Sequence, residues 1–290
     1  MDKKQIQERT QAAFKYVQSL GYRPVYIGLY GSQNYGLDVH DKDYQSDLDW
    51  KCLILPTLTD LIQNSKPVST VLEFDGGQID LKDVRAFTDS VVKCNVNFLE
   101  ILTTNYFHCE NQSVLELRKQ VVPLMKEMWF LYLKACFGMM KEKEAALRHP
   151  YPKTKHRVDQ FWYDPKQLHH VARLKILIER YVACSKKDYI WNVANFAHYG
   201  NEQEQLVALK KWLLTNEEVD ESVKFLLEKA IEAIEDFKRP MIFTAKARTI
   251  QLARDLILNE IIKWIRENES WLNSSTPVLP NDSANTVETP

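Results

Sequence analysis

Glycine is distributed unevenly along this chain of 290 residues, and that distribution most limits its possible folds. Six of the eight glycines lie at or before Gly77, and only Gly138 and Gly200 follow. Glycine is concentrated where a chain needs tight turns or close approach of its backbone. We therefore expect mixed α/β structure in roughly the first hundred residues and helices in the remainder.

The N-terminal part combines amphipathic and β-prone segments. An amphipathic helix should end at Gly21, and Asp83 should cap a later helix. Two β-prone runs around Asp75-Gly76-Gly77 predict a hairpin with a glycine turn. The expected strands are 25–30, 48–55, 68–74 and 78–81.

Helical periodicity dominates from about residue 113 onward. The expected helices are 115–140, 164–184, 202–214, 218–237 and 241–271. The last eighteen residues, 273–290, are polar, contain proline and have no period, which predicts a disordered tail. The predicted fold class is therefore α+β, with a mixed sheet and flanking helices over 1–112, an all-helical domain over 113–272, and the tail.

Charge, cysteine spacing and hydrophobicity give no sign of a zinc-binding, secreted or membrane-spanning protein. The chain has 38 Lys and Arg against 39 Asp and Glu, so its net charge of -1 gives no global sign of nucleic-acid or membrane binding. The five cysteines have irregular spacing without a zinc pattern, which indicates thiols in a reducing compartment. The N-terminus has no apolar signal sequence, and the apolar run 128–140 is too short to span a bilayer. We expect a cytoplasmic protein without a membrane partner.

A Gly-Ser turn followed by paired aspartates is the motif most informative about chemistry. Gly31-Ser32 follows a short strand, and Asp47 and Asp49 open another strand fifteen residues after Ser32. Because side chains alternate along a strand, the two carboxylates should point to the same face. They would repel each other without a cation, and Mg²⁺ is usually held by one or two carboxylates together with substrate phosphates. Backbone amides at the turn should bind phosphate oxygens.

Two further acidic segments bear on this site. Asp80 on the returning strand of the hairpin is well placed to be a third carboxylate. Asp41-Lys42-Asp43 is a rival Asp-x-Asp pattern. We reject it because Lys42 would be a poor inward residue and no apolar strand follows, whereas Leu48 and residues 52–55 supply one.

These motifs together resemble the DNA polymerase β-like nucleotidyltransferase superfamily, whose signature is a Gly-Ser turn, then Asp-x-Asp, then a later Asp. The resemblance is closer to the predicted nucleotidyltransferases of bacteria and phages, and it runs from about residue 25 to 185. The matching segments are 31–37, 46–49, 80–85, 97–102 and 163–170, with Arg173.

The resemblance implies a nucleotidyltransferase-type N-terminal domain and a role for each residue of the motif. Asp47 and Asp49 would hold Mg²⁺ or Mn²⁺, Asp80 would be the third carboxylate, and Gly31 with Ser32 would bind a nucleoside triphosphate. The interval from Ser32 to Asp47 is about four residues longer than the family pattern.

A second motif lies on a predicted helix. Asp164-Pro165 is a typical helix start, and Lys166, His170 and Arg173 then follow at i, i+4 and i+7 on one polar stripe. Stretch 141–187 holds 12 Lys and Arg against 5 Asp and Glu. The stripe is either an ordinary solvated basic face or a positive surface for a triphosphate or a polyanionic acceptor.

The predicted function is transfer of a nucleoside monophosphate from NTP to an acceptor hydroxyl, with release of pyrophosphate. Asp47, Asp49 and Asp80 would be the catalytic residues. Gly31, Ser32, Lys166, His170 and Arg173 would bind the nucleotide. The alternative is a catalytically silent nucleotide-binding or interaction module on the same fold. The acceptor stays open between an RNA end, a protein hydroxyl and a small molecule.

Overall fold

A computed structural model describes residues 2–40, 46–110, 129–149, 155–186, 196–211 and 214–237, together with isolated positions 115, 118–119, 152, 251, 254–255, 258–259 and 262–263. Several predictions lie outside these residues. They are the rival pattern Asp41-Lys42-Asp43, most of the predicted helix 241–271, the tail 273–290 and most of 115–128.

The N-terminal part contains a mixed five-stranded sheet. Its strands are β1 (Pro24–Tyr30), β2 (Asp49–Ile54), β3 (Ser69–Phe74), β4 (Gly77–Asp83) and β5 (Phe107–His108). Their spatial order is β3-β4-β2-β1-β5, with β2 and β4 parallel and the other neighbours antiparallel. The four predicted strands are confirmed. The two residues of β5 are too few to give a sequence pattern.

The predicted hairpin is formed by β3 and β4. Its turn places Asp75 at φ 51° and Gly76 at φ 73°, the left-handed pair that a two-residue hairpin turn prefers. The next residue, Gly77, has to be glycine because a Cβ at this position would lie 1.8 Å from the Leu48 carbonyl oxygen. The glycine turn therefore fixes the register that brings β4 against β2.

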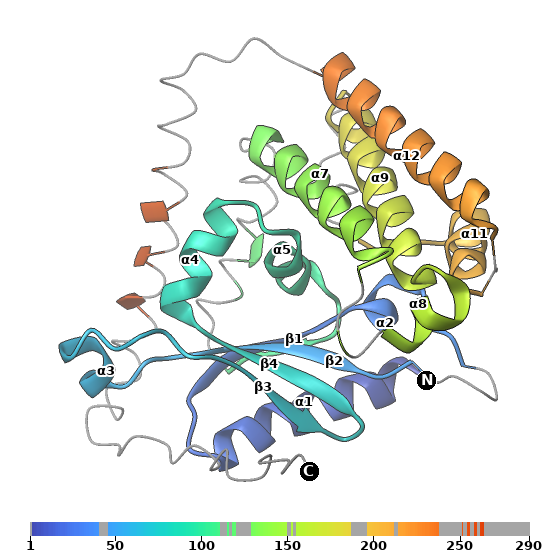
Figure 1. Ribbon diagram of the computed structural model, residues 1–290. Coiled ribbons are helices and arrows are strands. Elements are labelled where there is room, and N and C mark those ends of the chain that lie inside the picture. The colour runs from blue at the N-terminus through green and yellow to red at the C-terminus, as the bar shows by residue number, and fades with distance from the viewer. Residues whose placement is uncertain are drawn as a thin grey trace, which may run out of the picture.

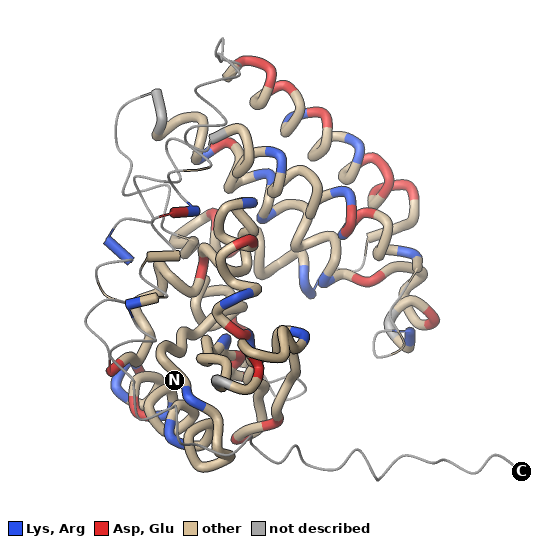
Figure 2. The backbone as a smooth tube through the Cα atoms, turned by 90° about the vertical axis from the view of Figure 1, so that its left-hand side faces the viewer, with Lys and Arg blue, Asp and Glu red and all other residues tan. Residues whose placement is uncertain are grey.

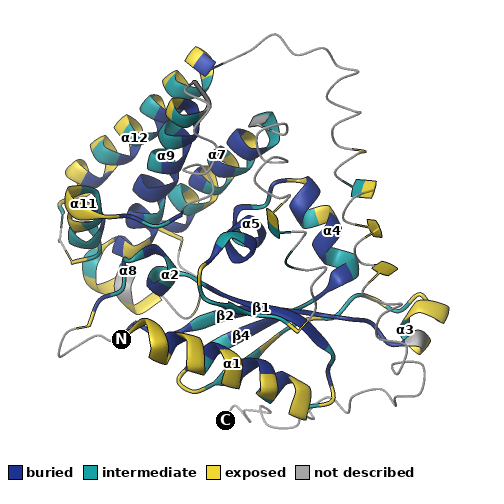
Figure 3. Ribbon diagram, turned by 180° about the vertical axis from the view of Figure 1, so that it is seen from behind, coloured by how far each residue is buried: buried dark blue, intermediate teal, exposed yellow. Residues whose placement is uncertain are grey.

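The two faces of the sheet differ in what covers them. One face packs against α1 (Lys3–Ser19) through alternate residues such as Ile27, Leu29 and Trp50. The opposite face lies toward α4 (Val84–Val92) and α5 (Val96–Thr103), as Figures 1 and 3 show. The short helices α2 (Ser32–Tyr35) and α3 (Leu58–Ile62) follow β1 and β2.

The C-terminal part is helical in its described residues. It consists of α7 (Trp129–Ala146), α8 (Lys155–Phe161), α9 (Pro165–Lys186), α11 (Gly200–Lys211) and α12 (Asn216–Phe237). Predicted helices 164–184, 202–214 and 218–237 are confirmed with small shifts of their ends. The α+β class is therefore established.

One hydrophobic core runs across the predicted domain boundary at residue 112. Tyr26 and Leu53 from the sheet belong to the same buried cluster as Tyr132, Leu168 and Val171 from the helices. The helical part is thus packed directly on the sheet domain. The bounds 1–112 and 113–272 stay a prediction about secondary structure, because the packing itself is continuous.

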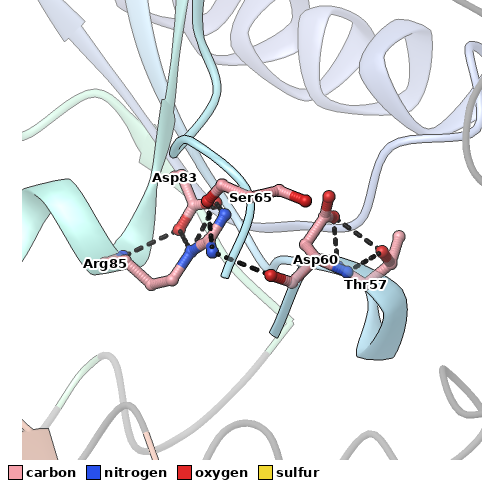
Figure 4. Close-up of polar contacts among 5 residues, drawn as sticks. All are labelled: Thr57, Asp60, Ser65, Asp83 and Arg85. Atoms are coloured by element: carbon pink, nitrogen blue, oxygen red, sulfur yellow. Dashed lines mark hydrogen bonds and ion pairs between the residues drawn. The ribbon is translucent and has the colours of Figure 1, made fainter. Parts of the chain in front are cut away.

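A buried polar cluster joins the end of β4 to the start of α4 (Figure 4). Asp83 accepts a hydrogen bond from the Arg85 amide at 2.8 Å, as the predicted cap should. The Arg85 guanidinium pairs with the Asp83 carboxylate at 2.6 Å and donates to the Ser65 carbonyl at 3.0 Å. Asp83 therefore has a structural role.

The thiols and the length of the helices bear on two of the expectations from composition. All five cysteines are free thiols, and Cys52, Cys94 and Cys136 are buried. None of the helices within the described ranges has both the length and the apolar content needed to cross a bilayer.

Candidate active site

A cavity of about 530 Å³ lies between the sheet domain and the helices. Its floor comes from the end of β1, the α2 turn and the start of β2, and its other walls come from α7, α8, α9 and α11. Figure 1 shows α8 and α9 next to α2, although they are far apart in the sequence. The volume falls within the range of about 300–1,000 Å³ that is typical of small-molecule sites.

The paired aspartates line this cavity. Leu48 points into the core against α1, so Asp47 and Asp49 on either side of it face the other way, as the alternation predicts. Asp47 is exposed, whereas Asp49 is half-buried. Burial, followed by the charge of Asp47, raises the pKa of the Asp49 carboxyl to about 6, although Lys166 on α9 opposes this.

The Gly-Ser turn forms another part of the floor, and its two residues differ in availability. Gly31 has φ 84°, a conformation that favours glycine, and its amide donates to Glu100 Oε1 at 2.8 Å. That amide is therefore not available to a phosphate oxygen. Within the described residues, the amide and hydroxyl of Ser32 have no hydrogen-bond partner, so Ser32 is the member of the pair that can receive a phosphate oxygen.

Glu100 organises the turn, a role that sequence analysis missed. Its carboxylate is fully buried on α5 and accepts from Asn34 Nδ2 at 3.1 Å and from the Tyr35 hydroxyl, in addition to Gly31. Burial raises the pKa of Glu100, and the charge of Arg173 works against that shift. The available signal was a single acid inside the apolar segment 96–103, because a buried carboxylate needs partners.

We predict that Glu100→Gln loosens the turn. The glutamine amide would keep one oxygen that accepts from Gly31 and Asn34, but its N–H₂ group would face the Tyr35 hydroxyl, which leaves at least one buried polar hydrogen unpaired at a cost of about 2 kcal/mol. The free energy of unfolding, measured by urea denaturation, should fall by that amount. Glu73→Gln is the matched control, since Glu73 is an exposed residue of β3. Equal stability of the two variants would contradict the role of Glu100.

Asp80 lies on the same sheet face as Asp49 but does not line the cavity. Its carboxylate pairs with Lys51 Nζ at 2.6 Å and with Lys82 Nζ at 3.0 Å. Among the described residues, no group of three or more His, Cys, Asp or Glu side chains is arranged to hold a metal ion. The structure thus brings Asp47 and Asp49 together at the cavity and gives Asp80 two cationic partners outside it.

The helix α9 supplies the polar stripe that the sequence predicts. Asp164 caps it by accepting from the Lys166 amide at 3.0 Å, and Lys166, His170 and Arg173 all line the cavity. Burial lowers the pKa of His170 well below its usual value, so this histidine is neutral near pH 7 and the positive charge of the stripe comes from Lys166 and Arg173.

Arg173 is the most unusual polar side chain in the cavity. Only 2% of it is exposed, its guanidinium carbon lies 4.0 Å from the centre of the Tyr35 ring, and its Nε and Nη1 have no hydrogen-bond partner. A buried guanidinium with two unpaired donors is costly unless an anion binds there. The nearby Glu100 carboxylate supplies part of the negative charge that this buried guanidinium needs, and the side chain also lines the cavity.

The helix α11 adds a lysine that the sequence did not single out. Lys210 lines the cavity and donates to the Leu37 carbonyl at 2.6 Å. Burial, followed by the charges of Lys166 and Arg173, lowers its pKa to about 8. Lys210 lies 37 residues after Arg173 in the sequence, so no local pattern connects the two.

Several other basic residues of the stretch 141–187 are in ion pairs. Arg148 pairs with Asp220, Lys175 with Glu179, and Arg180 with Glu202. Figure 2 shows how acidic positions along α12 lie close to the basic ones of the neighbouring helices. His169 is buried against the Leu206 carbonyl at 2.7 Å, which is a packing role.

Known proteins were compared with this chain by family model, by sequence and by structure. No family model matches the sequence, and no curated protein matches it. The chain is similar to a nucleotidyltransferase-like protein from Exiguobacterium sibiricum 255-15, with 12% sequence identity and a TM-score of 0.29 over 90% of this chain and 91% of that one. The roles of individual residues here rest on the geometry of the cavity.

Proposed function

We propose that this protein transfers a nucleoside monophosphate from a nucleoside triphosphate to an acceptor hydroxyl. The observation that carries the proposal is one cavity with two opposed kinds of group. Asp47 and Asp49 lie on its floor, and the unpaired, buried guanidinium of Arg173 lies in its wall. Paired carboxylates suit a divalent cation, and a buried guanidinium suits phosphate oxygens.

The carboxylates fit a magnesium or manganese ion. Both side chains offer hard oxygen ligands, and Asp47 is exposed to solvent. Burial, followed by the charge of Asp47, raises the pKa of Asp49, and a cation would offset both effects. Asp47 and Asp49 would hold the ion together with phosphate oxygens. When bound, such an ion neutralises charge that builds up on the phosphate oxygens during displacement.

The cationic side chains and the turn would orient the triphosphate. Ser32 offers an amide and a hydroxyl, and Arg173, Lys166 and Lys210 add positive charge to the same cavity. The reaction forms a bond between the acceptor oxygen and the α-phosphorus and breaks the bond from that phosphorus to the bridging oxygen. Pyrophosphate leaves, and the acceptor loses its proton.

The acceptor would be an RNA end, a protein hydroxyl or a small molecule. The ion pairs within 141–187 reduce the free positive charge that an RNA would meet outside the cavity. Recognition through phosphates weakens steeply with salt, so the salt dependence of acceptor binding separates RNA from the other two.

A silent nucleotide-binding module is the second candidate. It is favoured by the absence of Asp80 from the lining of the cavity, since the superfamily pattern includes a third carboxylate. Nucleotide binding without a metal-dependent product would select it.

Labelled ATP, CTP, GTP and UTP, each with Mg²⁺ or Mn²⁺ and cell extract, test transfer directly. We expect wild type to label an acceptor and Asp47→Ala plus Asp49→Ala to lose at least 10³-fold of the rate, because charge stabilisation at the reacting phosphate contributes several kcal/mol. Glu73→Gln should keep the wild-type rate. Label that persists in the double variant would contradict the proposal.

A further inference from the structure

The buried ion group Lys51–Asp80–Lys82 has no part in the function proposed so far. Asp80 is only 9% exposed and Lys51 only 6%. Lys51 lies directly opposite Asp80 in the parallel pairing of β2 with β4, and its Nζ is 2.6 Å from Asp80 Oδ2. Lys82 approaches the other carboxylate oxygen at 3.0 Å. Both oxygens of Asp80 therefore face an ammonium group.

Lys51 also lies beside the paired aspartates. It is two residues after Asp49 on β2, so both side chains project from the same face of the sheet. Its Nζ is 4.1 Å from the centre of the Tyr30 ring, and Tyr30 lines the cavity. A fixed positive charge thus contacts Asp80 and lies on the same sheet face as Asp49.

We propose that the site binds a single divalent cation, held by Asp47 and Asp49, and that the Lys51 ammonium occupies the place where a second cation would bridge Asp49 and Asp80. Asp80 is then a positioning residue that holds Lys51. Lys51 hydrogen-bonds one oxygen of Asp80, and Lys82 lies within ion-pair distance of the other oxygen, which has no hydrogen-bond partner. The two ammonium groups offset the negative charge that a metal ion would need, and an ammonium beside Asp49 repels such an ion. This inference rests on the proposed function, since it concerns the metal of the same site.

The number of bound ions tests the proposal independently of turnover. Mn²⁺ would be titrated into the full-length protein in the presence of each α,β-methylene nucleoside triphosphate, with the free ion measured by electron paramagnetic resonance. The Mn²⁺ bound by nucleotide alone, measured in a parallel titration without protein, would be subtracted. We expect one protein-bound Mn²⁺ per chain for wild type, still one for Asp80→Asn, and none for Asp47→Asn plus Asp49→Asn.

Two lysine variants sharpen the test. Lys51→Met should remove the ammonium group that contacts Asp80 Oδ2 and allow a second Mn²⁺ to bind there. Lys82→Met is the matched control, because Lys82 contacts the same carboxylate but is not beside Asp49, and it should keep one ion. A single ion in Lys51→Met would overturn the role given to Lys51.

The count in wild type remains decisive even if a variant fails to fold. Two ions in wild type would overturn this inference and leave nucleotidyl transfer intact. No bound ion with any of the four analogues would remove both the inference and the proposed metal site.

Discussion

Replacing Asp49 with asparagine is expected to abolish nucleotidyl transfer while making the ligand-free protein more stable at neutral pH. The pKa of Asp49 is raised to about 6 by burial and by Asp47. Its ionised form therefore lowers the free energy of unfolding. A shift of that size on a partly exposed group corresponds to about 1 kcal/mol after allowance for solvent screening. The melting temperature of the ligand-free protein should therefore rise by about 2 °C.

The stability difference between Asp49→Asn and wild type should depend on pH. A carboxyl whose folded pKa is raised stabilises the fold below its unfolded pKa near 4, and that contribution is lost as the pH rises through about 6. The advantage of Asp49→Asn over wild type should therefore be small near pH 4 and full above pH 6.5. Melting curves across this range measure it, with Glu73→Gln as the control.

Mg²⁺ and nucleotide should affect the melting temperatures of wild type and Asp49→Asn differently. Mg²⁺ with a nucleoside triphosphate should raise the melting temperature of wild type, because binding to the native state stabilises it by mass action. The same ligands should leave Asp49→Asn unchanged. A destabilised variant together with a wild type indifferent to Mg²⁺ and nucleotide would contradict the metal site.

Replacing Arg173 with methionine is expected to weaken nucleoside triphosphate binding about 100-fold. Arg173 lines the cavity, and a hydrogen bond to a charged group contributes roughly 1.5–3 kcal/mol, so the loss of one or two such bonds corresponds to about 100-fold. Titration calorimetry with each of the four triphosphates and the corresponding nucleosides measures the loss. Since nucleosides carry no phosphate, their affinity should change little.

Two further variants separate charge from geometry at this position. Arg173→Lys keeps the charge but loses the planar pair of donors, so it should recover only part of the affinity. Arg148→Met is the control, because Arg148 pairs with Asp220 away from the cavity. Equal triphosphate affinity in wild type and Arg173→Met would show that the phosphates bind elsewhere.

The sequence by itself determined the local elements and one part of the site. Alternation around Leu48 put Asp47 and Asp49 on one face, and the glycine turn at Asp75-Gly76 set the hairpin. Asp164-Pro165 located the start of α9 and thereby the stripe of Lys166, His170 and Arg173. These features depend on residues a few positions apart, so periodicity and capping rules are sufficient to find them.

Only the tertiary structure decided which of these groups are free to act. Burial makes His170 neutral, Glu100 takes the amide of Gly31, and Lys51 and Lys82 occupy Asp80. Lys210 enters the cavity from a helix with no local link to α9. Each of these outcomes depends on desolvation or on a partner far away in the chain, and neither is encoded in the spacing of neighbouring residues.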